Sequence, residues 1–365
     1  PGTRAMSGDF TDQPTPVREG QGFDVAALST YLQGALALDG PLAIEQFGRG
    51  FSNLTYLVRA GERELVLRRA PPGVKIKSAH DMGREFRILS HLADVWPKAP
   101  RPLAHCEDES IIGTLFYVME RVRGVILRQR LPKGLVLDAP TMARVSTAMI
   151  DTLAEIHTLD YRAAGLGDLG KPEGYIARQV NGWAERYRKA QTDDVPQVEQ
   201  LQQWLVANMP RETGASLVHN DFKYDNVVLA PDLSSVAAVL DWEMATLGDP
   251  LMDLGTTLGY WIDPDDPPVF QVMVFGPTNL PGNLSRVELV RRYEEKTGKS
   301  VGSVLYYYAC ALFKLSVVAQ QLYKRYHDGL TKEERYAPML EGVRAVTSAA
   351  LVAIDKGRID RLNER

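Results

Sequence analysis

The stretch from Leu217 to Pro250 constrains the fold of this chain most, because it places many carboxylates beside short apolar runs. It reads LVHNDFKYDNVVLAPDLSSVAAVLDWEMATLGDP, and the segments NVVL and SVAAVLDW are typical of strands. Burying a carboxylate is costly unless a positive partner compensates its charge. A metal ion is one such partner, and the positions of the polar residues indicate which kind.

Three of these polar residues are spaced as a set. Asn226 comes just before the first strand and Asp241 just after the second, so an antiparallel hairpin would bring both to the same end. Asp221, on the loop that enters the hairpin, adds a third oxygen ligand. Hard oxygen ligands without thiolates suit Mg²⁺, which often binds together with substrate phosphates. The alternative is that Asp and Asn only cap and turn the chain here; the spacing beside two strands favours a site.

The apolar spacing divides the rest of the chain into two parts. Strands are predicted at 42–47, 54–60, 64–70, 101–108 and 115–122, with helices at 23–36 and 80–95. Beyond residue 139 helices are predicted at 141–159, 174–190, 198–209, 286–298, 304–329 and 337–357. We therefore expect an α+β, bilobal chain, with a flexible tail (1–22), a small five-stranded antiparallel lobe (23–121) and a larger helical lobe (122–365).

Composition narrows the function classes. The chain has 365 residues, 45% of them hydrophobic, and a formal net charge of -4, which gives no support for nucleic-acid binding. The apolar run 301–313 stops at Lys314, well short of the roughly 20 residues that span a membrane, and the uncharged stretch 267–285 is interrupted by prolines, glycines and asparagines. The two cysteines, Cys106 and Cys310, fit a reducing compartment, so we expect a cytoplasmic protein. Its oligomeric state stays open.

A glycine-rich segment, FGRGFSN, joins the first two predicted strands. Gly48 and Gly50 permit a close backbone approach that a side chain would block. Backbone amides, Ser52 and Asn53 could then face phosphate oxygens. Taken alone, this pattern is usually only a turn.

A cation and a carboxylate follow at kinase-like positions. Arg68 ends a predicted strand, and Glu85 lies on the next helix. Kinases hold a phosphate-binding side chain in this way, although a surface ion pair is the simpler interpretation of two charges alone. The order of glycine hairpin, strand cation, helix glutamate, hinge strand, H-x-D-x-x-x-x-N and strand-ending aspartate resembles that of protein kinases. The details differ: HND replaces HRD, DWE replaces DFG, and no APE follows.

These departures match the aminoglycoside phosphotransferase and choline kinase-like family, which has a protein-kinase-like fold. The segments LVHNDFKYDNVVL and VLDWEMATLGDPLMDLG carry the resemblance. FGRGFSNLTYLVR, LVLRRAPPG, REFRIL and YVMERVRG agree with it in order, from about Asp24 onward. The chain is particularly similar to the phosphotransferase domain found with some acyl-CoA dehydrogenases, on LRRAPPG, GDPLMDLG and FKLSVVAQQLYKR.

The resemblance implies an ATP- and Mg²⁺-dependent phosphotransferase that moves the γ-phosphoryl group to a hydroxyl of a small molecule. Asp221 would be the catalytic base or would orient the acceptor hydroxyl. Lys223 would neutralise the transferred phosphoryl group. Asn226 and Asp241 would hold Mg²⁺ on the ATP phosphates.

The nucleotide contacts follow from the same resemblance. Arg68 would contact phosphate where the family often has lysine, and Glu85 would orient it. The backbone of Glu120 and Val122 would meet adenine at the hinge between the lobes.

Other polar residues are assigned supporting roles. By the resemblance, His219 braces the catalytic loop, and Asp249 and Asp253 fix it structurally. His157 is expected to be a packing and hydrogen-bonding residue. The turn DPDDPP, residues 263–268, is expected to be exposed.

The acceptor stays open. A hydroxyacyl-CoA is favoured by the likeness to acyl-CoA proteins and by Lys314, Gln321 and Arg325, which share one face of a predicted helix and could meet coenzyme A phosphates. The alternative for that face is a solvated basic surface. An aminoglycoside or amino-alcohol kinase is the second candidate. A non-catalytic nucleotide-binding regulator is opposed by the three intact oxygen ligands, and a metal-dependent hydrolase would not need the hinge and glycine hairpin.

Overall fold

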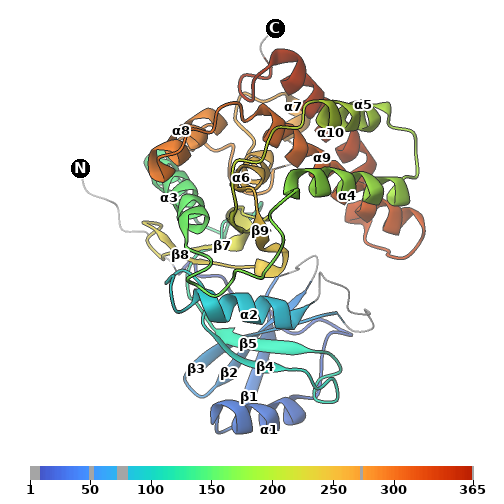
Figure 1. Ribbon diagram of the computed structural model, residues 1–365. Coiled ribbons are helices and arrows are strands. Elements are labelled where there is room, and N and C mark those ends of the chain that lie inside the picture. The colour runs from blue at the N-terminus through green and yellow to red at the C-terminus, as the bar shows by residue number, and fades with distance from the viewer. Residues whose placement is uncertain (1–8, 49–52, 72–80, 272–273, 364–365) are drawn as a thin grey trace. The chain divides into compact units, whose positions relative to one another are not determined.

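The computed structural model describes residues 9–48, 53–71, 81–271 and 274–363 (Figure 1). The chain forms two compact units, and each is described by itself. The first comprises Pro1–Ile126, Ala163–Leu166 and Asn226–Met244. The second comprises Leu127–Arg162, Gly167–Asp225 and Ala245–Arg365.

The first unit is built on a five-stranded sheet. Its strands, in spatial order, are β1 (Leu42–Gln46), β2 (Leu54–Ala60), β3 (Arg63–Arg69), β5 (Phe116–Glu120) and β4 (Pro102–Cys106). Every neighbouring pair is antiparallel, so the predicted five-stranded antiparallel sheet is confirmed. Two helices accompany it, α1 (Val25–Leu36) and α2 (Met82–Leu92).

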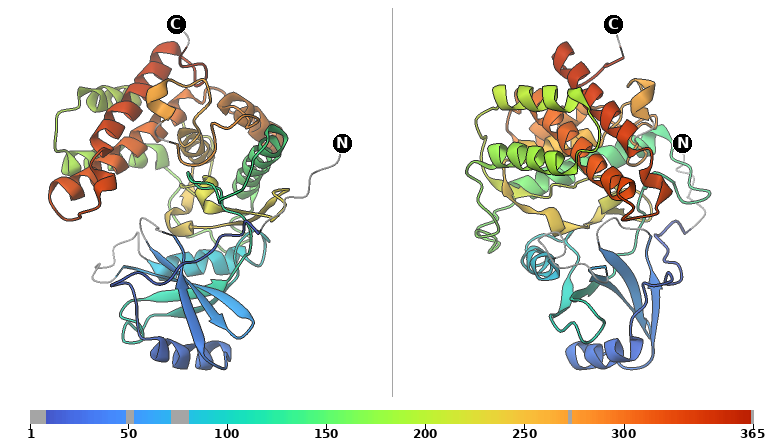
Figure 2. Two further views of the ribbon diagram at one scale, coloured as in Figure 1. Left: turned by 180° about the vertical axis from the view of Figure 1, so that it is seen from behind. Right: turned by 90° about the vertical axis from the view of Figure 1, so that its right-hand side faces the viewer.

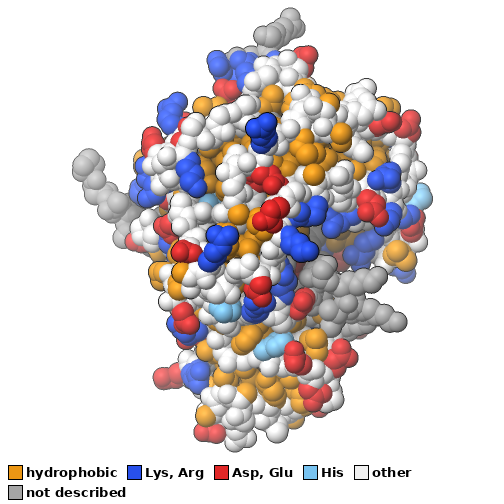
Figure 3. Space-filling model, in the orientation of Figure 1, with side chains coloured by type: hydrophobic (Ala, Val, Ile, Leu, Met, Phe, Trp, Pro, Cys, Tyr) orange, Lys and Arg blue, Asp and Glu red, His pale blue; other side chains and the backbone are white. Residues whose placement is uncertain are grey.

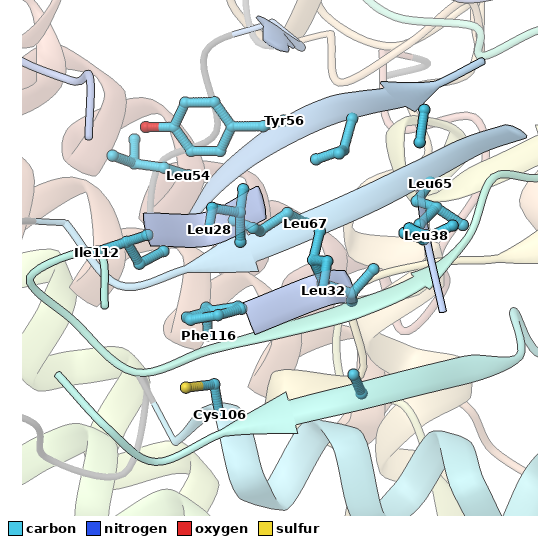
Figure 4. Packing of buried hydrophobic residues seen from close by; sticks show 14 residues of the cluster. Leu28, Leu32, Leu38, Leu54, Tyr56, Leu65, Leu67, Cys106, Ile112 and Phe116 are labelled. Carbon is cyan, nitrogen blue, oxygen red and sulfur yellow. The ribbon is translucent and has the colours of Figure 1, made fainter. Parts of the chain in front are cut away.

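Alternation along β3 sends neighbouring side chains to opposite faces of the sheet. Leu67 points to the face that α1 covers, where it joins Leu28, Leu32 and Phe116 in the hydrophobic core (Figure 4). All four are 0% exposed. Arg68, the next residue, points to the opposite face, where it meets α2. The period-two pattern therefore sets which side chains form the core and on which face of the sheet Arg68 lies.

The segment before α1 is bonded to this sheet. Thr15 pairs with Gln46 of β1, and Gln21 accepts hydrogen bonds on its carbonyl oxygen from Tyr56 at 2.6 Å and Arg69 at 2.8 Å. Arg69 is 1% exposed, and its buried donors need acceptors, which this carbonyl helps to supply. Residues 9–22 of the predicted flexible tail are thus tied to the first unit, while residues 1–8 lie outside the described residues.

Two short antiparallel strand pairs lie between residues 216 and 248 of the sequence. The strands β7 (Val227–Leu229) and β8 (Val236–Val239) pair antiparallel within the first unit, as the sequence predicts. In the second unit β6 (Ser216–Val218) pairs with β9 (Thr246–Gly248), a pairing that the sequence does not predict. Three-residue strands are too short for a period to show.

The second unit is helical (Figure 2). Its α-helices are α3 (Ala139–Thr158), α4 (Tyr175–Ala190), α5 (Pro196–Ala207), α6 (Pro250–Gly259), α7 (Pro268–Gln271), α8 (Arg286–Thr297), α9 (Leu305–His327) and α10 (Met339–Lys356). Of the short 3₁₀ segments, η4 (Glu334–Tyr336) lies in this unit, η3 (Trp242–Met244) lies in the first unit, and η2 (Tyr224–Asn226) spans the boundary between them. Helix α9 packs against α4, α5, α6 and α10 and is therefore the central helix of this unit.

Helix α6 is not predicted by the sequence, because its glycines weaken its helical propensity. They are required by packing: a Cβ at Gly255 would lie 2.5 Å from the carbonyl oxygen of Tyr307 in α9. This close approach fixes α6, which carries Asp253 and ends beside Tyr260, against the central helix.

The surface charge and the hydropathy of the helices can be compared with two expectations from the sequence, a small net charge and no segment that spans a membrane. On the face shown in Figure 3, basic and acidic side chains both occur, which agrees with the small net charge. By length and composition, one segment of the described chain, Glu334–Lys356, could cross a membrane. It includes α10, which packs against α9, and core helices pass the same test.

Candidate active site

The β7–β8 hairpin brings two predicted metal ligands to one end. Asn226 directly precedes β7, Asp241 follows β8, and Val227 pairs with Val239. The amide of Leu240 donates to the carbonyl oxygen of Asn226 at 2.8 Å, which closes this end of the hairpin. The sequence predicted this arrangement.

Asp241 is also where the chain turns sharply. Its φ is +67°, in the left-handed region that disfavours most side chains but is tolerated by aspartate and asparagine. Such backbone conformations cluster at functional sites. The turn leads into η3, whose Trp242 is fully buried and donates from its indole to the carbonyl oxygen of Val239 at 2.9 Å.

Arg68 lies at the centre of a buried charge cluster in the first unit. Its Nη2 donates to Oδ1 of Asp241 at 2.7 Å, and its Nε lies 3.3 Å from Oε2 of Glu85. Glu85, 1% exposed, also accepts from the amide of Trp242 at 3.1 Å. Burial opposes the charge of Arg68, but Glu85 and Asp241 outweigh it and raise the pKa of the guanidinium. Glu85 therefore holds both the cation on β3 and the backbone beside Asp241.

The glycine-rich segment is described in part. Gly48 lies in the bend after β1, while Gly50 and Ser52 lie outside the described residues. Asn53 is 5% exposed, and its Nδ2 donates to Oε2 of Glu243 at 2.6 Å. Asn53 thus contacts a carboxylate of the DWE triplet, a partner that the sequence does not predict.

The hinge residues lie at the end of β5. Glu120 is paired with Leu65 of β3, its side chain is exposed, and its amide donates to the carbonyl oxygen of Arg101 at 2.9 Å. Val122 packs against the small cluster formed by Ile126, Val228 and Ala238, and so against the β7–β8 hairpin. The hinge is thereby fixed to the element that carries Asn226 and Asp241.

In the second unit, Asp221 is surrounded by donors. The Nζ of Lys223 lies 2.9 Å from Oδ2 and 3.1 Å from Oδ1, and the hydroxyl of Tyr260 donates to Oδ1 at 2.5 Å. Burial opposes ionisation, but the charges of Lys223 and Lys314 and the Tyr260 hydroxyl outweigh it and lower the pKa of Asp221. Asp221 is therefore an anion at neutral pH.

Asp253 fixes the loop that carries Asp221. Fully buried on α6, it accepts from the amides of His219 at 2.6 Å and Asn220 at 2.8 Å. His157 of α3 lies 3.0 Å from the Asp253 carboxylate through Nε2 and 2.8 Å from the Tyr293 hydroxyl through Nδ1, which confirms its expected hydrogen-bonding role. The Asp253 carboxylate thus fixes the backbone of the loop by accepting hydrogen bonds from its amides.

Asp249 fixes the chain that leads to this loop. It caps α6 by accepting from the amide of Leu251 at 2.9 Å, and it accepts from the amide of Thr213 at 2.6 Å. Its carboxylate, 1% exposed, is thus occupied by backbone donors, which suits the structural role the sequence suggested.

Lys314 is placed differently from the sequence-based hypothesis. It is 8% exposed, and its Nζ donates to the carbonyl oxygen of Asn220 in the loop that carries Asp221. It does not lie on a solvent-facing surface with Gln321 and Arg325, both of which are exposed. A signal was available: Lys314 interrupts the run YYYACALFKLSVV, whose residues are apolar on every side of a helix, so its ammonium needed an internal partner.

The turn DPDDPP is the second correction. Asp263 and Asp266 are 2% and 4% exposed, so this part of the turn is buried. Asp266 receives two hydrogen bonds of 2.6 Å from the guanidinium of Arg286. The distant arginine, fully buried on α8, makes the burial possible, and local composition could not reveal it.

The comparisons with known proteins follow this geometry. The model of the phosphotransferase enzyme family matches residues 43–286, so the chain belongs to that family. A structure described as a putative aminoglycoside phosphotransferase from Ralstonia eutropha is 30% identical and covers 92% of this chain and 99% of its own, with a TM-score of 0.77. Choline kinase from Cryptosporidium parvum, 12% identical, covers 93% of this chain and 99% of its own with a TM-score of 0.64 and shows the fold alone. The kinase-like fold is thus confirmed.

Two curated relatives are longer proteins. Acyl-CoA dehydrogenase family member 10 of Mus musculus is 37% identical over 344 residues, which are 93% of this chain and 32% of the relative. Acyl-CoA dehydrogenase family member 11 of Homo sapiens is 34% identical over 322 residues, which are 86% of this chain and 40% of the relative. The chain spans about a third to two fifths of these proteins, and the predicted likeness to the domain found with acyl-CoA dehydrogenases is confirmed.

Proposed function

We propose that the chain is an ATP- and Mg²⁺-dependent phosphotransferase that moves the γ-phosphoryl group to a hydroxyl of a small molecule. The observation that carries this proposal is the placement of Asn226 and Asp241 at one end of the β7–β8 hairpin, with Arg68 against Asp241. Membership of the phosphotransferase family supports it.

The chemistry of the donors at the hairpin suits Mg²⁺. Asn226 and Asp241 offer an amide oxygen and a carboxylate, and the Asp241 side chain is 27% exposed and so accessible to a solvent-borne ion. Within the described ranges, no group of three His, Cys, Asp or Glu side chains is arranged to hold a metal. Mg²⁺ commonly takes only one or two protein carboxylates and fills its remaining positions with water and substrate phosphates. When bound, it would neutralise charge on the ATP phosphates.

The transfer step assigns roles to Asp221 and Lys223. The acceptor oxygen forms a bond to the γ-phosphorus, the bond to the oxygen bridging the β- and γ-phosphates breaks, and ADP leaves. Asp221 accepts the hydrogen bond of the acceptor hydroxyl and takes its proton late in the transfer. Because the pKa of Asp221 is lowered, it is a weak base, which fits a reaction governed by positioning. Lys223 offsets charge on the moving phosphoryl group.

The nucleotide is assigned to the first unit. Arg68, held by Glu85, contacts the phosphates and provides the positive charge that lysine provides in many family members. The glycine-rich segment, with Gly48, Gly50, Ser52 and Asn53, is proposed to meet the phosphates; Gly50 and Ser52 lie outside the described residues. Adenine meets the backbone of Glu120 and Val122.

We further propose a hydroxyacyl-CoA as the acceptor. Its support is the similarity to proteins named as acyl-CoA dehydrogenases. Of the proposed basic helix face, Gln321 and Arg325 remain available at the surface. An aminoglycoside or amino alcohol is the second candidate, since structural neighbours include an aminoglycoside phosphotransferase in complex with hygromycin B, at 17% identity, and a choline kinase.

One screen separates these readings. Purified protein is incubated with Mg-ATP and, in turn, hydroxyacyl-CoAs, aminoglycosides, amino alcohols and sugars, and ADP formation is followed with and without EDTA. We expect EDTA-sensitive turnover with one class and none with Asp221→Asn. Mg-ATP binding without turnover of any acceptor would support the non-catalytic regulator instead.

A further inference from the structure

We propose that Lys314 is a positioning residue for the proposed catalytic aspartate: from α9 it holds the backbone carbonyl beside Asp221 and supplies a fixed positive charge there. The inference rests on the proposed phosphotransferase function, because it concerns the same carboxylate. It assigns to the catalytic step a residue that lies 94 positions along the chain from the loop it supports.

The backbone of Asn220 shows why the loop needs support. Its φ is +64°, a left-handed conformation that few residues adopt and that asparagine tolerates at single positions. Three helices hold it: Asp253 of α6 accepts from its amide at 2.8 Å, Tyr175 of α4 donates to its Oδ1 at 2.9 Å, and Lys314 of α9 donates to its carbonyl oxygen. The direction of the next residue, Asp221, depends on these bonds.

Burial makes the Lys314 contact specific. Lys314 is 8% exposed, and a buried ammonium group must be compensated by nearby acceptors or negative charge. Besides the Asn220 carbonyl, Lys314 has the face of Trp183 at 5.9 Å from Nζ and the charge of Asp221 nearby. Burial lowers the pKa of Lys314, and the Asp221 charge opposes that shift. The hydrogen bond between Lys314 and Asn220 therefore stabilises both the buried ammonium group and the backbone of the loop.

The two lysines beside Asp221 therefore act differently. Lys223 bonds the carboxylate itself and is 18% exposed, so it can turn towards a phosphoryl group. Lys314 bonds the backbone one residue earlier and stays inside the protein. Both lower the pKa of Asp221, but only Lys314 also fixes the loop.

The test compares two substitutions at Lys314 with one matched control. Lys314→Met removes the charge and the donor at nearly constant length, and Lys314→Arg keeps both. Lys189→Met makes the same change on α4, where Lys189 is 73% exposed and pairs with Glu185. For each folded variant, kcat and KM are measured with the acceptor from the screen, Mg-ATP affinity by calorimetry, and amide exchange over residues 217–226 by mass spectrometry.

We expect Lys314→Met to lower kcat by about 10- to 100-fold, with Mg-ATP affinity within about threefold, because misplacement of a positioned group acts on the transfer step. Loop exchange should become faster. Lys314→Arg should recover part of kcat, and Lys189→Met should match the wild type. If Lys314→Met does not fold, Lys314→Gln, which keeps a donor without the charge, takes its place.

The result that overturns the inference is wild-type kcat and wild-type loop exchange in Lys314→Met. A loss of folded protein with unchanged kcat per folded molecule would overturn it too, because that is a purely structural role. Should the wild type turn over neither acceptor nor ATP, the proposed function fails separately. Amide exchange of the loop then decides alone. Exchange that is faster in Lys314→Met but not in Lys189→Met supports the positioning role, and unchanged exchange in Lys314→Met contradicts it.

Discussion

The guanidinium of Arg68 donates a hydrogen bond of 2.7 Å to the carboxylate of Asp241, joining β3 to the residue that follows β8. Glu85 approaches the same guanidinium at 3.3 Å from α2. In the proposed enzyme, Asp241 contacts Mg²⁺ and Arg68 contacts phosphate. Nucleotide binding would then exchange a protein ion pair for contacts between each partner and Mg-ATP.

The first prediction concerns Asp241. Asp241→Ala should weaken Mg-ATP binding by at least about tenfold, or ~1.4 kcal/mol, because it removes the carboxylate among the proposed metal ligands. Isothermal titration calorimetry measures this change. Asp232→Ala, in the turn of the same hairpin, is the matched control and should bind as the wild type does. Unchanged affinity in a folded Asp241→Ala variant would rule out the metal role.

The second prediction concerns the stability of the first unit. Arg68→Met leaves Glu85 buried without its cation, and breaking such a pair costs about 3–5 kcal/mol. Urea unfolding should show this loss. Arg68→Met combined with Glu85→Gln should recover part of it, because no uncompensated charge remains. Equal unfolding midpoints for Arg68→Met and the wild type would show that the pair does not stabilise the fold.

The third prediction is a pH dependence from Asp263. Burial raises the pKa of Asp263 from 3.8 to about 7, against the opposing charge of Arg286. The folded protein therefore binds this proton more tightly than the unfolded chain, so this group's contribution to stability falls as pH rises from about 4 to about 7 and is level above.

Asp263→Asn removes that contribution. The difference in unfolding free energy between Asp263→Asn and the wild type should shift in favour of the variant as the pH rises and then level off above about pH 7. Urea unfolding across this range measures it. Asp265→Asn, a change at the exposed neighbouring position, should show only a small trend, because the charge of Asp265 is a minor cause of the raised pKa of Asp263. A pH-independent difference for Asp263→Asn would contradict the assignment.

The fourth prediction tests the support of the catalytic loop from α4. A Cβ at Gly248 would lie 2.7 Å from the ring of Tyr175, whose hydroxyl holds Asn220. Gly248→Ala should therefore destabilise the protein by about 1–3 kcal/mol and speed amide exchange in the loop. Gly342→Ala, on α10 with no atom within 4 Å of the added Cβ, is the control. Wild-type exchange in Gly248→Ala would show that the loop does not depend on this packing.

The fold could be predicted where the signal is local. The alternation of apolar and polar residues along β2 and β3 is visible in short stretches of sequence, and so are the polar ends of the β7–β8 hairpin. The sheet and the placement of Asn226 and Asp241 were therefore predicted. Helix α6 could not be, since its stability comes from the packing of Gly255 against α9. The intrinsic helix propensity of its residues, two of which are glycines, argues against a helix at this position.

The contacts around the candidate site were predictable only where they are local. The two motifs proposed to carry the catalytic residues could be named, because the spacing of their residues is local. Tyr260, at the end of α6, bonds Asp221, and Lys314 of α9 bonds the preceding residue, Asn220. The buried partner of Arg286, Asp266, lies 20 residues before it. Such contacts depend on tertiary packing, which the spacing of residues in one segment does not report.

The most direct test of the central claim is transfer of the γ-phosphoryl group itself. Wild type and Asp221→Asn are incubated with γ-³²P-labelled ATP, Mg²⁺ and a hydroxyacyl-CoA, and label in the acceptor is counted. We predict label transfer that requires Mg²⁺ and falls by about 10²–10⁴-fold in Asp221→Asn, while Mg-ATP affinity is largely retained. Near-wild-type transfer by Asp221→Asn, or no transfer by the wild type to any of the screened acceptor classes, would contradict the account.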